Sequence, residues 1–148
     1  MWAGVLGSLM STGLAQSQAV VEWSASTQSG AGSQAHIVRL SGIIPKGWHV
    51  YGINQLPGGP IPLGIRIDQG APYEISGTPQ GTTPQRHHDA SFDLDTEYFT
   101  DSVELSFPIK GTSSEANPNI PLSVRFQMCS DTTCLPPRTI HLIAKSGS

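Results

Sequence analysis

The chain has 148 residues, of which 13% are charged, and carries a formal net charge of −3. This length suits one domain with a single hydrophobic core, and the charge provides no basic surface for nucleic acid or anionic lipid. No apolar run reaches the roughly 18 residues that cross a bilayer. Two cysteines exclude a disulfide-dense scaffold and a four-thiolate zinc site. The 16 glycines and 12 prolines indicate a small domain rich in turns.

Residues 1–19 are predicted to be the remnant of a signal peptide. They are apolar and small, and the first charged residue is Glu22. The apolar stretch and the small residues of a cleavage site are present, while the basic start of a secretory signal is missing. A disordered or strand-forming N-terminus is the alternative. Residues 20–148 are expected to form the domain.

From residue 20 onward the sequence is typical of an all-β protein. Apolar and polar residues alternate most clearly over 103–109, 120–128 and 140–144. Weaker candidate strands cover residues 20–24, 36–40, 48–53 and 63–68. Short strands separated by Gly, Pro, Asn and Ser turns predict an immunoglobulin-like antiparallel β-sandwich.

Prolines and long loops add two further expectations about this fold. Pro108 and Pro121 fall inside predicted strands, so we expect them at sheet edges or bulges, where no ladder hydrogen bond is lost. Residues 54–62 and 77–95 are too long and too polar for simple hairpin turns. Loops of this kind in a compact domain are usually functional or mobile.

The most informative feature is the cysteine pair, Cys129 and Cys134, which follows the strongest predicted strand and encloses four residues. A four-residue loop predicts a hairpin whose neck brings the two Cβ atoms to about 4.5–5.5 Å. A disulfide across so short a loop stabilises by only about 2 kcal/mol, against roughly 4.7 for a loop of 100 residues. Since an exposed hairpin bridge is open to an attacking thiolate, we favour a redox role over a structural staple. The staple remains the alternative.

The order of residues around this pair resembles a known family. Residues 127–137 contain a glutamine, a cysteine, a short Asp-containing loop, a second cysteine and two adjacent prolines. This order resembles the redox segment of the N-terminal periplasmic domain of the DsbD thiol:disulfide interchange proteins. Residues 45–51, which resemble a Gly-aromatic-x-x-Tyr strand of the family, and residues 92–109 add weaker similarity in the same order. The resemblance implies a periplasmic, immunoglobulin-like domain that carries redox cysteines on a hairpin.

The resemblance also assigns roles to individual residues. It implies that Cys134 forms the mixed disulfide with partner proteins and that Cys129 resolves it. It places Phe92 in a cap loop that shields the pair, and it makes Tyr51 and Gln127 neighbours of the active site.

Two departures from the family pattern concern the same region. Some relatives have five residues between the cysteines, where this chain has four. The acidic pair that precedes the cap Phe in some relatives is replaced by Ala90 and Ser91, although Asp89 and Asp93 flank the segment. This leaves open whether any carboxylate accepts a proton beside the thiols.

The implied function is an electron relay with protein-disulfide reductase activity. A thioredoxin-like domain, supplied with electrons through a membrane-embedded domain, would reduce this domain. The domain would then reduce periplasmic oxidoreductases that isomerise disulfides or serve cytochrome c maturation. No cofactor and no nucleic acid is expected. The alternative is a secreted immunoglobulin-like binding module with a structural hairpin disulfide, whose binding face would be formed by residues 54–62 and 77–95.

The consecutive residues 86–89, Arg-His-His-Asp, suggest a metal site together with His49 as an alternative use of these side chains. Adjacent histidines in an extended segment point to opposite sides, so His87 and His88 are poorly placed to share one ion. We interpret the segment as a solvated loop and expect no metal.

Overall fold

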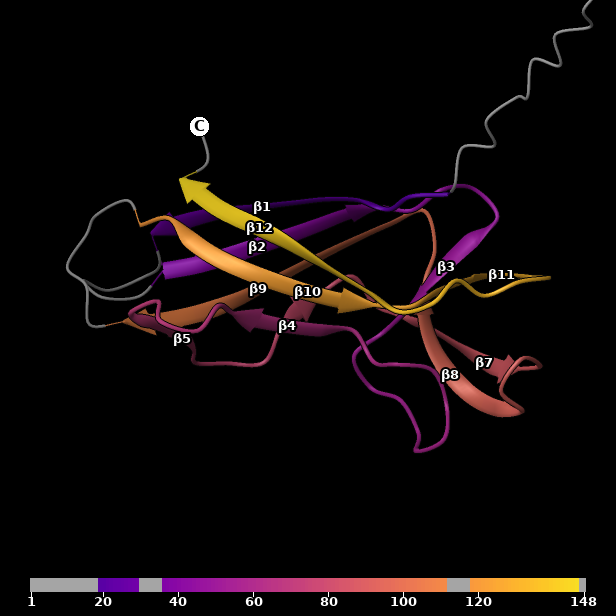
Figure 1. The fold of residues 1–148 in the computed structure, drawn as a ribbon. Helices are drawn as coiled ribbons and strands as arrows, with labels where there is room; N and C mark the ends of the chain where they lie inside the picture. The colour runs from indigo at the N-terminus through magenta and orange to yellow at the C-terminus, as the bar shows by residue number, and fades with distance from the viewer. Residues whose placement is uncertain (1–18, 30–35, 112–117, 147–148) are drawn as a thin grey trace, which may run out of the picture.

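The structure, a computed structural model, describes residues 19–29, 36–111 and 118–146. Over these ranges the chain consists of strands and turns with no helix, which confirms the all-β prediction (Figure 1). The described residues accordingly include no helix able to cross a membrane. The predicted signal-peptide remnant lies, except for Ala19, outside the described residues.

The larger of two sheets has eight strands. Their order is β4-β10-β12-β1-β2-β9-β5, and β6 pairs with β9 beside β5. The strand bounds are β1 Glu22–Ser29, β2 His36–Ile43, β4 Gly64–Ile67, β5 Tyr73–Ile75, β6 Gln80–Gly81, β9 Ser102–Gly111, β10 Ile120–Phe126 and β12 Arg138–Ser146. Strands β1 and β12 run parallel, whereas the other pairs of this sheet are antiparallel. The predicted antiparallel sandwich therefore contains one parallel pair.

The smaller sheet has four strands in the order β11-β3-β8-β7 and lies at one end of the molecule (Figure 1). Its strands are β3 Trp48–Tyr51, β7 Gln85–Asp89, β8 Leu94–Phe99 and β11 Met128–Ser130. The chain runs from β10 through the single residue Gln127 into β11, so one continuous segment belongs to both sheets. This arrangement ties the position of β11, and hence of the first cysteine, to the core of the domain.

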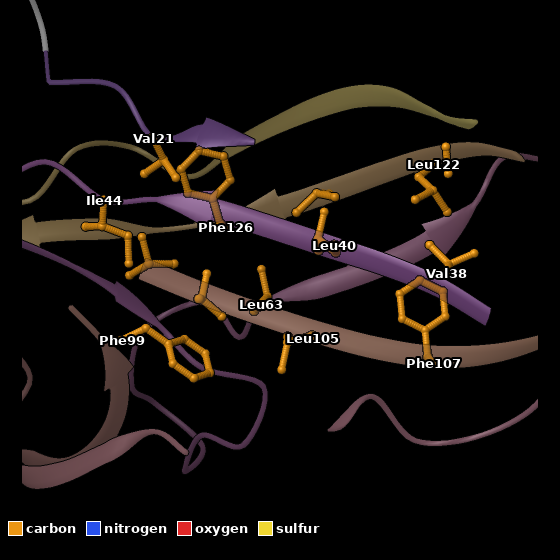
Figure 2. Close-up of a cluster of buried hydrophobic side chains, with 14 of the residues drawn as sticks. Val21, Val38, Leu40, Ile44, Leu63, Phe99, Leu105, Phe107, Leu122 and Phe126 are labelled. Carbon is orange, nitrogen blue, oxygen red and sulfur yellow. The ribbon is translucent and has the colours of Figure 1, made fainter. Parts of the chain in front are cut away.

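Alternate residues of β2, β9 and β10 form the centre of the hydrophobic core. Each of these side chains is at most 3% exposed, and Figure 2 shows several of them gathered between the strands: Val38, Leu40, Leu105, Phe107, Leu122 and Val124. Since successive strand residues point to opposite faces, the period-2 pattern of the sequence places them all inward. Full burial of such a side chain is worth about 1.5–3 kcal/mol relative to exposure.

All seven predicted strand segments overlap observed strands, but four observed strands were not predicted from the sequence. Strands β5, β6, β7 and β8 were not predicted, and the expected loop 77–95 is wrong because it contains β6, β7 and the start of β8. The residues of β7 are almost all polar and exposed, so they lack the apolar alternation that reveals a half-buried strand. The second expected loop, residues 54–62, is confirmed as irregular.

The prediction for the two prolines was also wrong. Pro108 lies in β9 and pairs with Ile37 of β2. Strand β9 has β2 on one side and β5 and β6 on the other. Pro121 lies in β10, between β4 and β12, and pairs with Ile143 of β12. Neither strand is an edge, but each proline lies next to the end of a shorter partner strand, where the ladder on that side is interrupted.

Candidate active site at the disulfide hairpin

The predicted cysteine hairpin is present and closed by a disulfide. Cys129 and Cys134 form an antiparallel bridge with Cα atoms 4.0 Å apart and an S–S bond of 2.03 Å. The Ser130 amide donates to the carbonyl of Thr133 at 2.7 Å, closing the turn. The Ser130 hydroxyl accepts hydrogen bonds from the amides of Thr132 and Thr133 at 3.3 and 3.2 Å. The turn is thus held by its own polar groups.

The two sulfur-bearing residues differ sharply in exposure. Cys129 is 0% exposed, whereas Cys134 belongs to the exposed turn segment. The cause is position, because Cys129 lies in β11 with β3 along its other side, whereas Cys134 is on the outer arm of the hairpin. Thiol–disulfide exchange requires a thiolate to approach a sulfur atom, so access favours attack at Cys134.

The strand pairing places His49 next to the disulfide. His49 of β3 is directly opposite Cys129 of β11. Residues paired in this way point to the same face of a sheet, with Cβ atoms about 4.5–5.5 Å apart. Cys129 therefore has His49 as its neighbour on one side and Cys134 on the other.

The two faces of the small sheet have different characters. Val50, Phe99 and Met128 belong to the hydrophobic core. Their neighbours in sequence point the other way, so His49 and Cys129 share the outer face with the remaining ring-bearing and polar side chains. That face also carries Tyr51, Tyr98, His87 and Asp89.

A buried carboxylate anchors this outer face. Asp89, 6% exposed, accepts a hydrogen bond from the Tyr51 hydroxyl at 2.6 Å. Its other oxygen accepts the Ser91 amide at 2.8 Å, and the Thr96 hydroxyl lies 3.4 Å from Oδ2. Burial alone would raise the pKa of the Asp89 carboxyl, but these hydrogen bonds and His49 outweigh it and hold the pKa below its usual value. Asp89 is therefore ionised at neutral pH.

Tyr51 joins Asp89 to His49. His49 Nε2 lies 3.1 Å from the Tyr51 hydroxyl, and the two rings meet edge to face at 5.0 Å. Burial, reinforced by the bond to Asp89, raises the pKa of Tyr51 far above its usual value, so its hydroxyl stays protonated. Burial also lowers the pKa of His49, and the opposing attraction of Asp89 and Asp131 does not cancel it. His49 is thus mainly neutral near pH 7.

Phe92 lies beside this network, in the turn that joins β7 to β8. Its half-buried ring meets Tyr51 edge to face at 5.7 Å. The turn is held by the bond from the Ser91 amide to Asp89, and Asp93 adopts a positive φ of 53° at its end. Asp89 therefore fixes both Tyr51 and the loop that carries Phe92.

Gln127 occupies the step between the two sheets. Its carbonyl accepts the Tyr51 amide at 3.1 Å, and its side-chain oxygen accepts the Ile61 amide at 2.9 Å. The side chain thus fastens the irregular segment 54–62 to the chain that leads into Cys129.

The histidines of β7 separate to opposite faces. His87 Nδ1 is 2.6 Å from the Tyr98 hydroxyl, whereas His88 pairs with Asp93 at 2.9 Å and Asp95 at 3.4 Å. Among the residues that the structure describes, no group of three metal-ligating side chains is close enough to hold an ion. Their interpretation as loop residues was wrong, since they form strand β7.

Comparison with known proteins agrees with this geometry. The family model described as "Thiol:disulfide interchange protein DsbD, N-terminal" matches residues 16–144. The chain belongs to this family. The family assignment and the closed cysteine pair together support thiol:disulfide interchange. No curated protein sequence matches the chain.

Two solved structures share the fold of this family member. The reduced N-terminal domain of DsbD from Neisseria meningitidis has a TM-score of 0.53 and 16% identity, covering 79% of this chain and 81% of its own. The N-terminal periplasmic domain of ScsB from Proteus mirabilis has a TM-score of 0.60 and 15% identity. That match covers 89% of this chain, which spans half of the ScsB chain.

The sequence reading missed two members of the site, His49 and Asp89. His49 was interpreted only as a candidate metal ligand, and Asp89 as part of the same candidate site and as a residue flanking the cap. A usable signal was present for each, because period-2 spacing places His49 with Tyr51 and Asp89 with His87. No pattern in the sequence indicates that these two pairs meet.

Proposed function

We propose that this domain relays electrons between proteins through the Cys129–Cys134 dithiol and disulfide. The proposal rests on one observation, a disulfide that joins an exposed cysteine to a buried one in a short hairpin. Cys134 is the residue that exchanges with partners, and Cys129 completes or reverses the exchange within the domain. A staple of this size contributes only about 2 kcal/mol, which is a weak reason to place a disulfide here.

The exchange proceeds in two displacements. A partner thiolate attacks the sulfur of Cys134, a new intermolecular S–S bond forms, and Cys129 leaves as a thiolate that takes up a proton. The second thiol of the partner loses its proton and attacks the partner's sulfur atom in the mixed disulfide, which releases Cys134 as a thiolate. Two electrons have then moved from the partner, which becomes a disulfide, to this domain, which becomes a dithiol. Running the steps backwards delivers the electrons to an oxidised acceptor.

The partners and compartment proposed for this domain follow from its family membership. The donor is a thioredoxin-like protein or domain, itself reduced through a membrane-embedded electron-transfer domain. The acceptors are periplasmic oxidoreductases that isomerise disulfides or serve cytochrome c maturation. The domain accordingly acts in the periplasm, the compartment named for the ScsB domain whose fold it shares.

Phe92 is proposed to limit access to the disulfide from the cap loop. Its contact with Tyr51 brings the loop to the outer face of the small sheet, where Cys129 also lies. Phe92→Ala should therefore speed reduction of the disulfide by a small dithiol such as dithiothreitol several-fold. Phe92→Leu, which keeps an apolar side chain there, serves as the matched control. An unchanged rate in Phe92→Ala would remove the shielding role.

The relay is tested by its potential and by trapping. The reduction potential is measured by equilibration with glutathione buffers. For trapping, Cys129→Ala and Cys134→Ala are each mixed with a thioredoxin that retains only its exposed cysteine. That cysteine is first activated as a mixed disulfide with an aromatic thiol. We expect Cys129→Ala to form the mixed disulfide and Cys134→Ala, whose remaining cysteine is buried, to fail. A potential far below about −300 mV with no trapped complex in either variant would instead identify a structural bridge.

A further inference from the structure

In the proposed relay, the thiol of Cys129 must lose a proton before it can attack Cys134, because the thiolate is the nucleophile. Cys129 is 0% exposed, and burial disfavours the charged thiolate form. Solvent is thus poorly placed to accept this proton. A neighbouring base on the protein would remove the difficulty.

We propose that His49 is the base that accepts the proton of Cys129 and returns it when the disulfide is reduced. The inference rests on the proposed function and assigns the proton transfer within it. Its geometric basis is the ladder position of His49, directly opposite Cys129 and on the same face of the small sheet. Cys134 flanks Cys129 on the other side, so the base, the attacking residue and the attacked residue stand in one row.

The hydrogen-bond network sets which nitrogen of His49 is basic. An ionised carboxylate only accepts hydrogen bonds, so the Tyr51 hydroxyl donates its proton to Asp89. The Tyr51 oxygen is then left to accept from His49 Nε2, 3.1 Å away. Neutral His49 therefore carries its proton on Nε2 and has its lone pair on Nδ1. When Nδ1 takes a second proton, the charge is stabilised through Tyr51 by the carboxylate of Asp89.

The surroundings of His49 are mixed in charge. The titratable groups that face it come from each element packed around it: Cys129 of β11, Asp131 of the hairpin turn, Tyr51 of β3, Tyr98 of β8, and Asp89 and His87 of β7. Burial and His87 favour the neutral ring, and the two carboxylates favour the imidazolium. The net effect is a pKa of His49 below its ordinary value, so the ring is mainly neutral near pH 7 and is free to accept a proton.

The reduced domain is oxidised in two displacements. The Cys134 thiolate attacks a disulfide, forms the mixed disulfide and expels one thiolate. Nδ1 of His49 takes the proton of Cys129, and the Cys129 thiolate attacks the sulfur of Cys134. The mixed disulfide breaks, the second thiolate leaves, and the Cys129–Cys134 bond forms. Two electrons pass to the external disulfide, and His49 releases its proton to solvent.

The test uses the reduced full chain and dithiobis(nitrobenzoate), an aromatic disulfide whose thiolate product is yellow. Stopped-flow absorbance resolves two phases, attack by Cys134 and then resolution by Cys129. We expect His49→Gln to slow the second phase about 100-fold and leave the first nearly unchanged. Tyr51→Phe, which removes the link to Asp89, should slow the second phase less. His88→Gln, on the opposite face of β7, is the matched control and should alter neither phase.

The pH profile separates a base from a merely structural residue. In the wild-type chain the second phase should rise with pH through the titration of His49, below the ordinary value near 6.5, and then level off. In His49→Gln this plateau should be missing, and the rate of the second phase should rise steadily with pH. Identical profiles and rates in both proteins would overturn the role of His49 while leaving the relay intact. Absence of the first phase in the wild-type chain would overturn the relay and this inference together.

Discussion

The two sheets of this domain bury different kinds of side chain. The large sheet encloses aliphatic and aromatic residues such as Leu40, Phe107 and Leu122, none more than 1% exposed. The small sheet buries carboxylates as well, and Asp89 and Glu97 are each only 6% exposed. A buried carboxylate is costly unless it is paired or hydrogen-bonded. Among the residues that the structure describes, buried carboxylates occur in the small sheet alone, which indicates that this sheet has a task besides folding.

Each buried carboxylate of the small sheet has partners that compensate for its burial. Asp89 on the outer face is bonded to Tyr51, and Glu97 on the core-facing side is bonded to the guanidinium of Arg86. The large sheet thus supplies stability through apolar burial, while the small sheet holds polar groups around the disulfide. Substitutions in the two sheets should therefore separate stability from chemistry.

The largest effect is expected at the exposed cysteine. Cys134→Ala should abolish exchange with protein and small-molecule disulfides, since the accessible sulfur is gone. Its stability should fall by only about 2 kcal/mol, the worth of so short a loop closure. Thiolate release and urea unfolding of the same preparation measure both quantities. Cys129→Ala is the control and should retain the initial attack; substantial exchange by Cys134→Ala would contradict the assignment.

A core substitution in the large sheet should have the opposite character. Phe107→Ala is expected to cost about 3–5 kcal/mol of unfolding free energy, because it leaves a cavity between β2, β9 and β10. The exchange rate of the folded molecules should stay within about two-fold of the wild type. Urea unfolding gives the first value, and kinetics well below the unfolding transition give the second.

The control for Phe107 is Ile143→Ala in β12, where the side chain is 52% exposed. Exposed positions away from special features usually change stability by less than about 0.5 kcal/mol. A large loss of exchange activity in folded Phe107→Ala would show that the two sheets are less independent than we conclude.

The carboxylate of Asp89 should make the stability of the domain depend on pH in a defined way, and Asp89→Asn should remove that dependence. The pKa of Asp89 is lowered in the folded state, so the unfolded chain binds its proton more readily. The resulting stabilisation is present above the unfolded pKa of about 3.9 and is lost as pH falls through the folded value. We expect Asp89→Asn to cost about 1–3 kcal/mol at pH 7. That difference should shrink as pH falls below about 4.

Urea unfolding of both proteins at a series of pH values measures this difference. Asp95→Asn, an exposed carboxylate on the other face of β8, is the control, and its effect should be small throughout. A cost of Asp89→Asn that stayed constant down to pH 3 would mean that the carboxylate contributes by packing rather than by charge.

The smallest effect on stability is expected at Gln127, the residue between β10 of the large sheet and β11 of the small sheet. Gln127→Ala removes the acceptor of the Ile61 amide and should cost about 0.5–1.5 kcal/mol, the net worth of one hydrogen bond. Gln127→Glu, which keeps an acceptor oxygen, should lose less. Comparing the unfolding free energies of the two variants isolates the bond from the rest of the side chain. Equal losses would assign the effect to packing.

Much of the fold was accessible from the sequence because apolar alternation is a local property. The patterns around Leu105 and Leu122 predicted β9 and β10, which form the core, and the spacing of Cys129 and Cys134 predicted the hairpin. Strand β7 was missed since its residues are exposed and polar. It is a strand because its backbone pairs with β8, a fact that depends on which segments meet in space.

The features of the candidate site also separate into those that depend on neighbouring residues in the chain and those that depend on contacts between distant strands. The sequence by itself determined the all-β class, the family resemblance and the redox pair, which all depend on residues close together in the chain. Only the tertiary structure decided that Asp89 reaches Tyr51 across 38 positions and that His49 faces Cys129. The physical reason is that strand periodicity sets the side to which a residue points, whereas hydrogen-bonded pairing between distant strands sets its neighbours.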